Sequence, residues 1–331
     1  MQQKKRTSRR IVALAACALA LAVHDSRAQP AWRPDKAVEL ITPSAAGGSN
    51  DKVARTLQKI MQNDKLVPVP VSVVNKPGGN QTLSRIYLNT HPGDAHYFDI
   101  GNPTLIANHV MGVSTQHYRD FTPIALLINE YTVFTVKADS PIRTVKDLME
   151  RLKKDPESMP VGVSNLGGTN HMTLALAAKS AGVDVKRLKV VVFKSNSESI
   201  TAVLGGHLQM VSASIPSVLS QVLAGNARII AVGAPRRMAG ALGEVPTLRE
   251  SGINITTSNW RAIIGPKGLG AAQIAYWEGV LAKAVASEEW KKQLETDHWE
   301  GNFLGSREFG KFLEAEYAEA KAVMTDLGLA K

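Results

Sequence analysis

Glycine and small polar residues follow an apolar run near the start of the chain, in a pattern that could bind an anion. Residues 37–42 have the composition of a short buried strand, and residues 53–61 have the apolar spacing of a helix. The turn between them, Pro43 to Asp51, ends in three residue types that commonly cap helices. The first backbone N–H groups of such a helix are unpaired and carry partial positive charge, so they can hold an anion. The alternative is a tight turn in which the glycines serve only backbone geometry.

Four further polar turns follow predicted strands in the same way. The strands cover residues 69–74, 97–101, 161–164 and 188–193. The carboxyl ends of parallel strands meet at one edge of a sheet, where α/β proteins bind ligands, so we expect the turns to form a site. They offer hydroxyl and amide groups that suit a small polar carboxylate, and they contain almost no arginine. The side chains concerned are those of Ser49, Asn50, Asn80, Gln81, Asn102, Thr104, Asn165, Thr169, Asn170, Ser195, Asn196 and Ser197.

The first 28 residues have the pattern of a secretory signal peptide. Five Lys and Arg residues between positions 4 and 10 precede the apolar run Ile11 to Val23, and Ala28 offers a small residue for cleavage. The apolar run is too short to span a membrane, so we expect an exported, periplasmic protein. Cys17, the only cysteine, lies in a box that resembles a lipoprotein cleavage site, and a lipid anchor there is the second choice.

Charge and composition exclude several functions. Removing residues 1–28 takes away six Lys or Arg and one Asp, so the net charge falls from +10 to +5. This modest charge suits an anionic small ligand. No cluster of Lys and Arg is interleaved with aromatic residues, so we expect no nucleic-acid partner. The exported chain has no cysteine, which excludes thiol catalysis and thiolate metal sites.

The histidines show no metal-binding or catalytic spacing, and we expect no catalytic residue, metal or cofactor. His171 lies beside a predicted ligand turn and could donate to a carboxylate, although a histidine bonded to its own local backbone is the favoured interpretation. An exported enzyme that acts on carboxylates and a periplasmic sensor subunit for a signalling partner stay open as alternatives to a binding protein.

Two segments are predicted to carry the chain between two α/β domains: the long apolar run Ile124 to Val136, and Asn254 to Ile264, which alternates as a strand does. Domain 1 is expected to comprise residues 29–128 and 262–331, and domain 2 residues 129–261. Two crossings at a hinge are typical of a binding protein that closes over its ligand. Residues 245–252 are predicted to form one short helix, and the chain beyond Pro266 is predicted to be helical.

Six stretches are distinctive in their order and spacing: residues 32–36, 43–51, 75–79, 204–207, 245–252 and 260–268. Together they resemble the extracytoplasmic solute receptors of tripartite tricarboxylate transporters, over essentially the whole exported chain. That resemblance implies a two-domain periplasmic-binding-protein fold that delivers a carboxylate to membrane permease subunits, and we expect a monomer.

The resemblance also implies which turns grip the ligand. Two turns of domain 1 would hold one carboxylate, and two turns of domain 2 would close over the far end. Compared with the family, Ser44 replaces an aromatic residue and the Ser212 to Ser214 segment replaces an acidic one, so we expect a di- or tricarboxylate. The implied ligand residues are Ala46, Gly47, Gly48, Ser49 and Asn50, with Pro77, Gly78, Gly79, Asn80 and Gln81, and in domain 2 Gly168, Thr169, Asn170, Ser195, Asn196 and Ser197.

Overall fold

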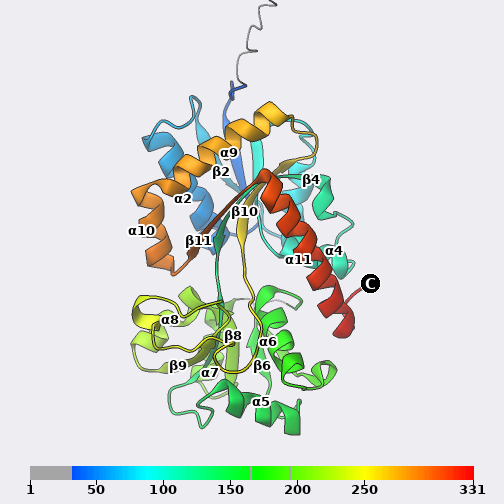
Figure 1. Ribbon diagram of the computed structural model, residues 1–331, viewed down its shortest axis with the longest axis vertical. Coiled ribbons are helices and arrows are strands. Elements are labelled where there is room, and N and C mark those ends of the chain that lie inside the picture. The colour runs from blue at the N-terminus through cyan, green and yellow to red at the C-terminus, as the bar shows by residue number, and fades with distance from the viewer. Residues whose placement is uncertain (1–31, 165, 194) are drawn as a thin grey trace, which may run out of the picture. The chain divides into compact units, whose positions relative to one another are not determined.

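The computed structural model describes residues 32–164, 166–193 and 195–331, without the side chain of Ser197. The expected signal peptide, Cys17 and the predicted turn residue Asn165 lie outside the described residues. Residues 34–331 form one compact unit that contains two β-sheets with helices packed on them (Figure 1). This mixed α/β architecture confirms the predicted fold class.

The first sheet has six strands in the order β11-β4-β10-β3-β1-β2. Strands β1, β2 and β3 run parallel to one another, whereas β10, β4 and β11 are antiparallel to their neighbours. The carboxyl ends of β1, β2 and β3 therefore share one edge, as the sequence predicted. The strands are β1 (Val38–Thr42), β2 (Val71–Asn75), β3 (Tyr97–Gly101), β4 (Phe121–Asn129), β10 (Arg261–Pro266) and β11 (Glu300–Gly305).

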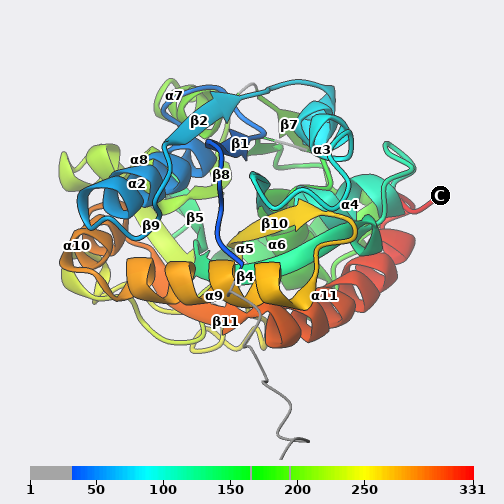
Figure 2. The ribbon, with the colours of Figure 1, turned by 90° about the horizontal axis from the view of Figure 1, so that it is seen from above.

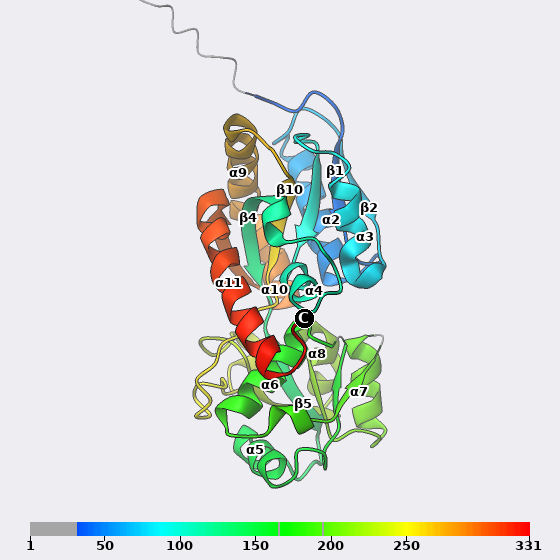
Figure 3. The same ribbon diagram turned by 90° about the vertical axis from the view of Figure 1, so that its right-hand side faces the viewer.

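Helices cover both faces of this sheet, which explains why its central strands are apolar on both sides. On one face α9 packs through Trp277 against Phe98 of β3, beside α2 and α10. On the other face lie α3, α4 and α11 (Figures 2 and 3). These helices enclose a core around Trp260 and Phe309. The helices are α2 (Ser49–Asn63), α3 (Thr82–Leu88), α4 (Thr104–Val110), α9 (Ala271–Ala286), α10 (Glu288–Asp297) and α11 (Ser306–Asp326).

The second sheet has five strands in the order β7-β6-β8-β5-β9. Side chains that alternate along β5 point to opposite faces: Phe134 packs with α5 and α6, and Val133 packs with α7 and α8. The strands are β5 (Thr132–Lys137), β6 (Val161–Val163), β7 (Val190–Val192), β8 (Met210–Ser214) and β9 (Ala227–Val232), and the helices are α5 (Val145–Lys154), α6 (Thr169–Ser180), α7 (Asn196–Leu204) and α8 (Ile215–Leu223).

The chain passes between the two sheets twice, and the two passages pair with each other. The first passage lies between β4 and β5, and the second leads into β10. Tyr131 and Ser258 form an antiparallel bridge, and the Asn259 N–H donates to the carbonyl of Glu130 at 2.8 Å. We call residues 129–131 and 258–260 the crossover ribbon. Two crossings are thus confirmed, while the residue limits of the two domains stay a prediction.

Two expectations about local structure were wrong. Residues 245–252 form turns rather than a helix, because the backbone around Thr247 is bonded to the end of β9 at Val232. Gly252 does end the segment, with φ +85°. The C-terminal region is not helical throughout, since β11 pairs with β4 between α10 and α11. Gly301 and Gly305 in this strand are poor helix formers, and they were the signal that the helical prediction overlooked.

Among the described residues, no helix has both the length and the apolar character needed to cross a bilayer.

Candidate ligand site

The first predicted turn, Pro43 to Gly48, joins β1 to α2. Gly47 has φ +87°, a left-handed conformation that favours glycine, and Gly48 is the extended N-cap of α2. Since glycine has no side chain to accept from the first helical N–H groups, these groups keep their partial positive charge for an external anion. The turn therefore has the geometry that an anion cradle needs, and Ala46 to Asn50 stay predicted ligand residues.

Asp51, in the first turn of α2, holds this loop in place. Its buried carboxylate accepts from the Gly47 N–H at 2.9 Å, from Arg55 Nε at 2.8 Å and from Asn75 Nδ2 at 2.9 Å. Burial alone would raise the pKa of Asp51, but these hydrogen bonds outweigh burial and lower that pKa. Asp51 is thus an internal anion that shapes the turn. The sequence suggested only a capping role for it.

The second turn follows β2 and has an unusual backbone. Gly78, Gly79, Asn80 and Gln81 all have positive φ, at 119°, 56°, 50° and 72°. Positive φ is uncommon for residues other than glycine and costs energy that surrounding contacts must offset. Asn108 of α4 supplies such contacts, since it bonds the Asn80 side chain at 2.6 Å and the Asn80 carbonyl at 2.7 Å.

The third turn, after β3, joins the first two through side-chain amides. Asn102 Nδ2 donates to Gln81 Oε1 at 2.7 Å and lies 3.5 Å from Asn50 Oδ1. The Thr104 hydroxyl lies 3.0 Å from the same Gln81 oxygen. Beneath this group Arg85 Nη2 donates to Thr104 Oγ1 at 3.0 Å. The structure thus brings together predicted residues of three turns, and it adds a buried arginine that the sequence did not single out.

The predicted residues of the second sheet also meet. Gly168 is the N-cap of α6, and Ser195 caps α7 by accepting from the Glu198 N–H at 3.1 Å. Asn170 Nδ2 donates to Asn196 Oδ1 at 3.1 Å. This sheet therefore also places two helix N-termini and two amides side by side.

His171 is bonded to its own local backbone, the interpretation that the sequence favoured. Its Nδ1 accepts from the Gly167 N–H at 3.0 Å, and burial lowers the pKa of the imidazole to about 4. A neutral, buried imidazole with one nitrogen already engaged is a structural group. Nothing in this geometry requires it to contact a ligand.

The crossover ribbon connects the two groups of turns. Glu130 and Arg261 form a buried ion pair at 2.9 Å, with side-chain exposures of 2% and 6%. Ser49 Oγ donates to the Glu130 carboxylate at 3.2 Å, and Thr169 Oγ1 donates to Asn259 Oδ1 at 3.4 Å. Predicted ligand residues on both sheets therefore contact the ribbon. The only sequence signal for Glu130 was that it interrupts a long apolar run.

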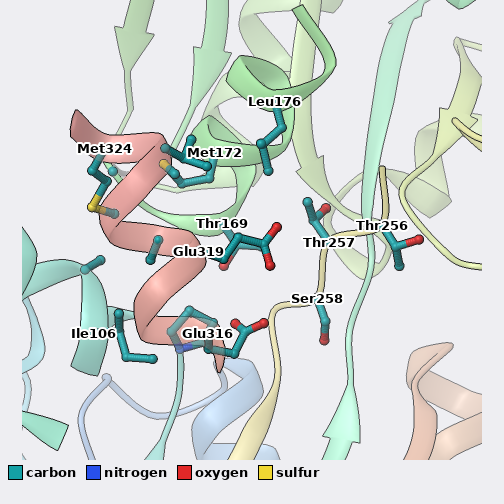
Figure 4. A pocket seen from close by; sticks show the side chains of 15 residues that line it. Ile106, Thr169, Met172, Leu176, Thr256, Thr257, Ser258, Glu316, Glu319 and Met324 are labelled. Carbon is teal, nitrogen blue, oxygen red and sulfur yellow. The ribbon is translucent and has the colours of Figure 1, made fainter. Parts of the chain in front are cut away.

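A cavity of about 90 Å³ lies on the α11 side of the second passage, between α4, α6 and α11 (Figure 4). Glu316 lines it and accepts a hydrogen bond from Trp260 Nε1 at 3.1 Å. Burial raises the pKa of Glu316 to about 7, Trp260 opposes that rise, and Glu319 adds to it. Thr169 is the one predicted ligand residue that lines this cavity, and Pro103 of the turn after β3 lines it too. It is a space beside the site and not its centre.

The part of the chain that the structure describes holds no cluster of three or more His, Cys, Asp and Glu that could bind a metal ion.

Comparison with known proteins now identifies the family. Residues 53–329 match the family model of the tripartite tricarboxylate transporter family receptor. The chain belongs to this receptor family. A UPF0065 protein from the gbd 5' region of Cupriavidus necator is 28% identical over 332 residues, which cover 100% of this chain and 99% of that protein.

Solved structures of similar proteins share the fold. A TctC solute-binding protein from Polaromonas, without ligand, superposes with a TM-score of 0.75 at 26% identity, covering 89% of this chain and 99% of that one. R. palustris Rpa4515, solved with adipate, gives a TM-score of 0.77 at 24% identity, covering 90% and 99%. MatC from Rhodopseudomonas palustris, with bound malate, gives 0.72 at 20% identity, covering 88% and 99%.

The receptor family consists of periplasmic solute-binding proteins and not of enzymes, which decides against the exported-enzyme alternative.

Proposed function

We propose that this receptor captures a small di- or tricarboxylate between its two domains in the periplasm and delivers it, as a monomer, to the permease subunits of a transporter. The observation that carries the proposal is the pairing of amide-rich turns on two sheets, each at helix N-termini whose N–H groups favour anions. The two relatives solved with adipate and malate support a carboxylate as the ligand class.

The neutral side chains beside the predicted ligand turns of the second sheet favour a ligand with more than one carboxylate. Ser212 is fully buried, and its hydroxyl donates to the carbonyl of Asn170 at 2.7 Å. Ser214 Oγ accepts from Asn196 Nδ2 at 3.3 Å. Neutral hydroxyls therefore stand next to the two ligand amides, where an acidic residue would repel a second carboxylate. Hydroxyl and amide groups leave room for that second negative charge.

Ligand capture would bend the chain at the crossover ribbon. The ribbon touches Ser49 of one group of turns and, through Asn259, Thr169 of the other. A ligand that bonds both groups would fix the angle between the domains, with residues 29–128 and 262–331 on one side and 129–261 on the other. We also propose that residues 1–28 are a signal peptide, which directs the receptor to the periplasm.

A thermal-shift panel of succinate, malate, adipate and citrate tests the ligand class. A ligand that binds only the folded state raises the free energy of unfolding by about 2.7 kcal/mol at one hundred times its dissociation constant. We expect at least one of these acids to raise the melting temperature, and its monoamide to do so less. No shift with any acid would contradict the proposal.

Two single substitutions test whether the ligand lies between the domains. Gln81→Ala removes an amide from the first sheet and Asn196→Ala removes one from the second. Both should weaken binding of the acid that stabilises the wild type. Asn226→Ala is the control, because the side chain of this exposed asparagine donates to Gln221 Oε1 at 3.0 Å and belongs to none of the predicted ligand turns. If only one of the two site variants loses affinity, the ligand binds one domain alone.

A further inference from the structure

The buried charge of Arg85 lies directly beneath the predicted ligand turns. Arg85 is 1% exposed and sits on α3, where it donates through Nη2 to Thr104 Oγ1 at 3.0 Å and to Asn102 Oδ1 at 3.4 Å. Its nearest opposite charge is Asp99 of β3, also fully buried. Neither oxygen of Asp99 has a hydrogen-bond partner among the residues that the structure describes.

A guanidinium can only donate hydrogen bonds, so it fixes which end of a neighbouring amide faces it. The Asn102 oxygen faces Arg85, and the same oxygen also accepts from the Thr104 N–H at 3.0 Å. The Thr104 hydroxyl lies 2.6 Å from it as well, so three donors, one of them backbone, determine the orientation of Asn102. Its NH₂ group must then point away from Arg85, toward the turns.

The orientation of Asn102 in turn sets that of the next amides. Its NH₂ group faces Gln81 Oε1 at 2.7 Å and Asn50 Oδ1 at 3.5 Å. Because the side-chain oxygens of Gln81 and Asn50 face Asn102, their NH₂ groups point away from Asn102. Neither NH₂ group has a hydrogen-bond partner within the described part of the chain. Two amide donors are thus left for a ligand.

We propose that Arg85 is a positioning residue that makes this site selective for carboxylates, by orienting the amides of Asn102, Gln81 and Asn50 so that only donors face the ligand. The inference rests on the proposed function and adds its basis of selectivity. A carboxylate presents two acceptor oxygens to such donors, whereas a carboxamide would set its own NH₂ against them. Arg85 acts through this orientation and does not touch the ligand.

Asp99 explains why orientation matters here more than net charge. Burial raises the pKa of Asp99 to about 6 although Arg85 opposes that rise, so at neutral pH the Asp99 carboxylate opposes the charge of Arg85. Burial lowers the pKa of Arg85 to about 10, so the guanidinium stays protonated. The net charge of the Arg85–Asp99 pair is then close to zero, so the ligand interacts with the oriented amide groups and not with a net positive charge.

Isothermal titration of the exported chain with adipate and with its monoamide, and with succinate and its monoamide, measures the selectivity. In Arg85→Met we expect the ratio of acid to amide affinity to fall by about tenfold or more, the equivalent of one charge-assisted hydrogen bond. Arg85→Lys, which keeps a cationic donor, should recover part of that ratio. Arg228→Met is the matched control, because Arg228 donates to three backbone carbonyls of residues 138–142.

Asn102→Asp tests the positioning role of Arg85 if the Arg85→Met variant fails to fold. The new carboxylate still accepts from Arg85, but it sets an oxygen against Gln81, which must turn its NH₂ group inward. Carboxylate affinity and the acid-to-amide ratio should both fall. An unchanged ratio in a folded Arg85→Met or in Asn102→Asp overturns the inference, even where the wild type binds the acids. If the wild type binds none of the four probes, the proposed function fails and the inference fails with it.

Discussion

Replacing Glu316 with Gln should make the receptor more stable at alkaline pH and remove part of its pH dependence. The folded protein raises the pKa of Glu316 from 4.5 to about 7, chiefly by burial. Between these values the folded state binds this proton more strongly than the unfolded state, so the free energy of unfolding falls as the pH rises. At 1.36 kcal/mol per pH unit, the loss is about 3 kcal/mol by pH 8. Glutamine stays neutral and can still accept from Trp260.

The measurement is chemical denaturation of the wild type and Glu316→Gln between pH 4.5 and 8. The variant should gain about 3 kcal/mol over the wild type across this range, or about 5 °C or more in melting temperature. Asp99 and His171 titrate in the same range in both proteins and cancel in the difference. Glu314→Gln, an exposed residue on the same helix, is the control. Parallel curves for wild type and Glu316→Gln would refute the reasoning.

Two further substitutions test the ribbon and the second turn. Arg261→Met leaves Glu130 buried without its cation and should lower the free energy of unfolding by about 3 kcal/mol or more. The double variant with Glu130→Gln should recover much of this loss. A loss below about 1 kcal/mol would mean that water reaches the pair. Gly79→Ala should cost more than Gly206→Ala in thermal denaturation, although both have positive φ. A methyl group at Gly79 would lie 2.5 Å from Thr82 Oγ1, whereas one at Gly206 would meet open space. Equal losses of thermal stability in the two variants would mean that the positive φ alone accounts for the loss.

The strand ends could be predicted because apolar runs and glycine-rich turns are local patterns. Tyr97 to Gly101 is a strand with the expected limits, and polar turns follow β1, β2 and β3 at one sheet edge. The two passages between sheets were also visible, the first as an apolar run too long for one strand and the second as a segment with β-type alternation. These features depend on neighbouring residues, so sequence alone carries them.

The residues that organise the site could not be predicted, because their roles come from tertiary contacts. Arg85 is an ordinary helix residue in sequence, and only the packing of α3 on β3 buries it beside Asp99. Asp51 has the composition of a helix cap, yet it accepts from Arg55 and Asn75. Such partners lie four to dozens of residues away, and no local pattern connects them.

The crossover ribbon also constrains how such a chain can change its length. Because Tyr131 pairs with Ser258, an insertion of one residue in either passage would shift its pairing and turn its side chains to the opposite face. Glu130 would then leave Arg261, and Ser49 would lose its acceptor. The two passages are 127 positions apart at this bridge, yet an insertion in one could be accommodated only by a matching insertion in the other.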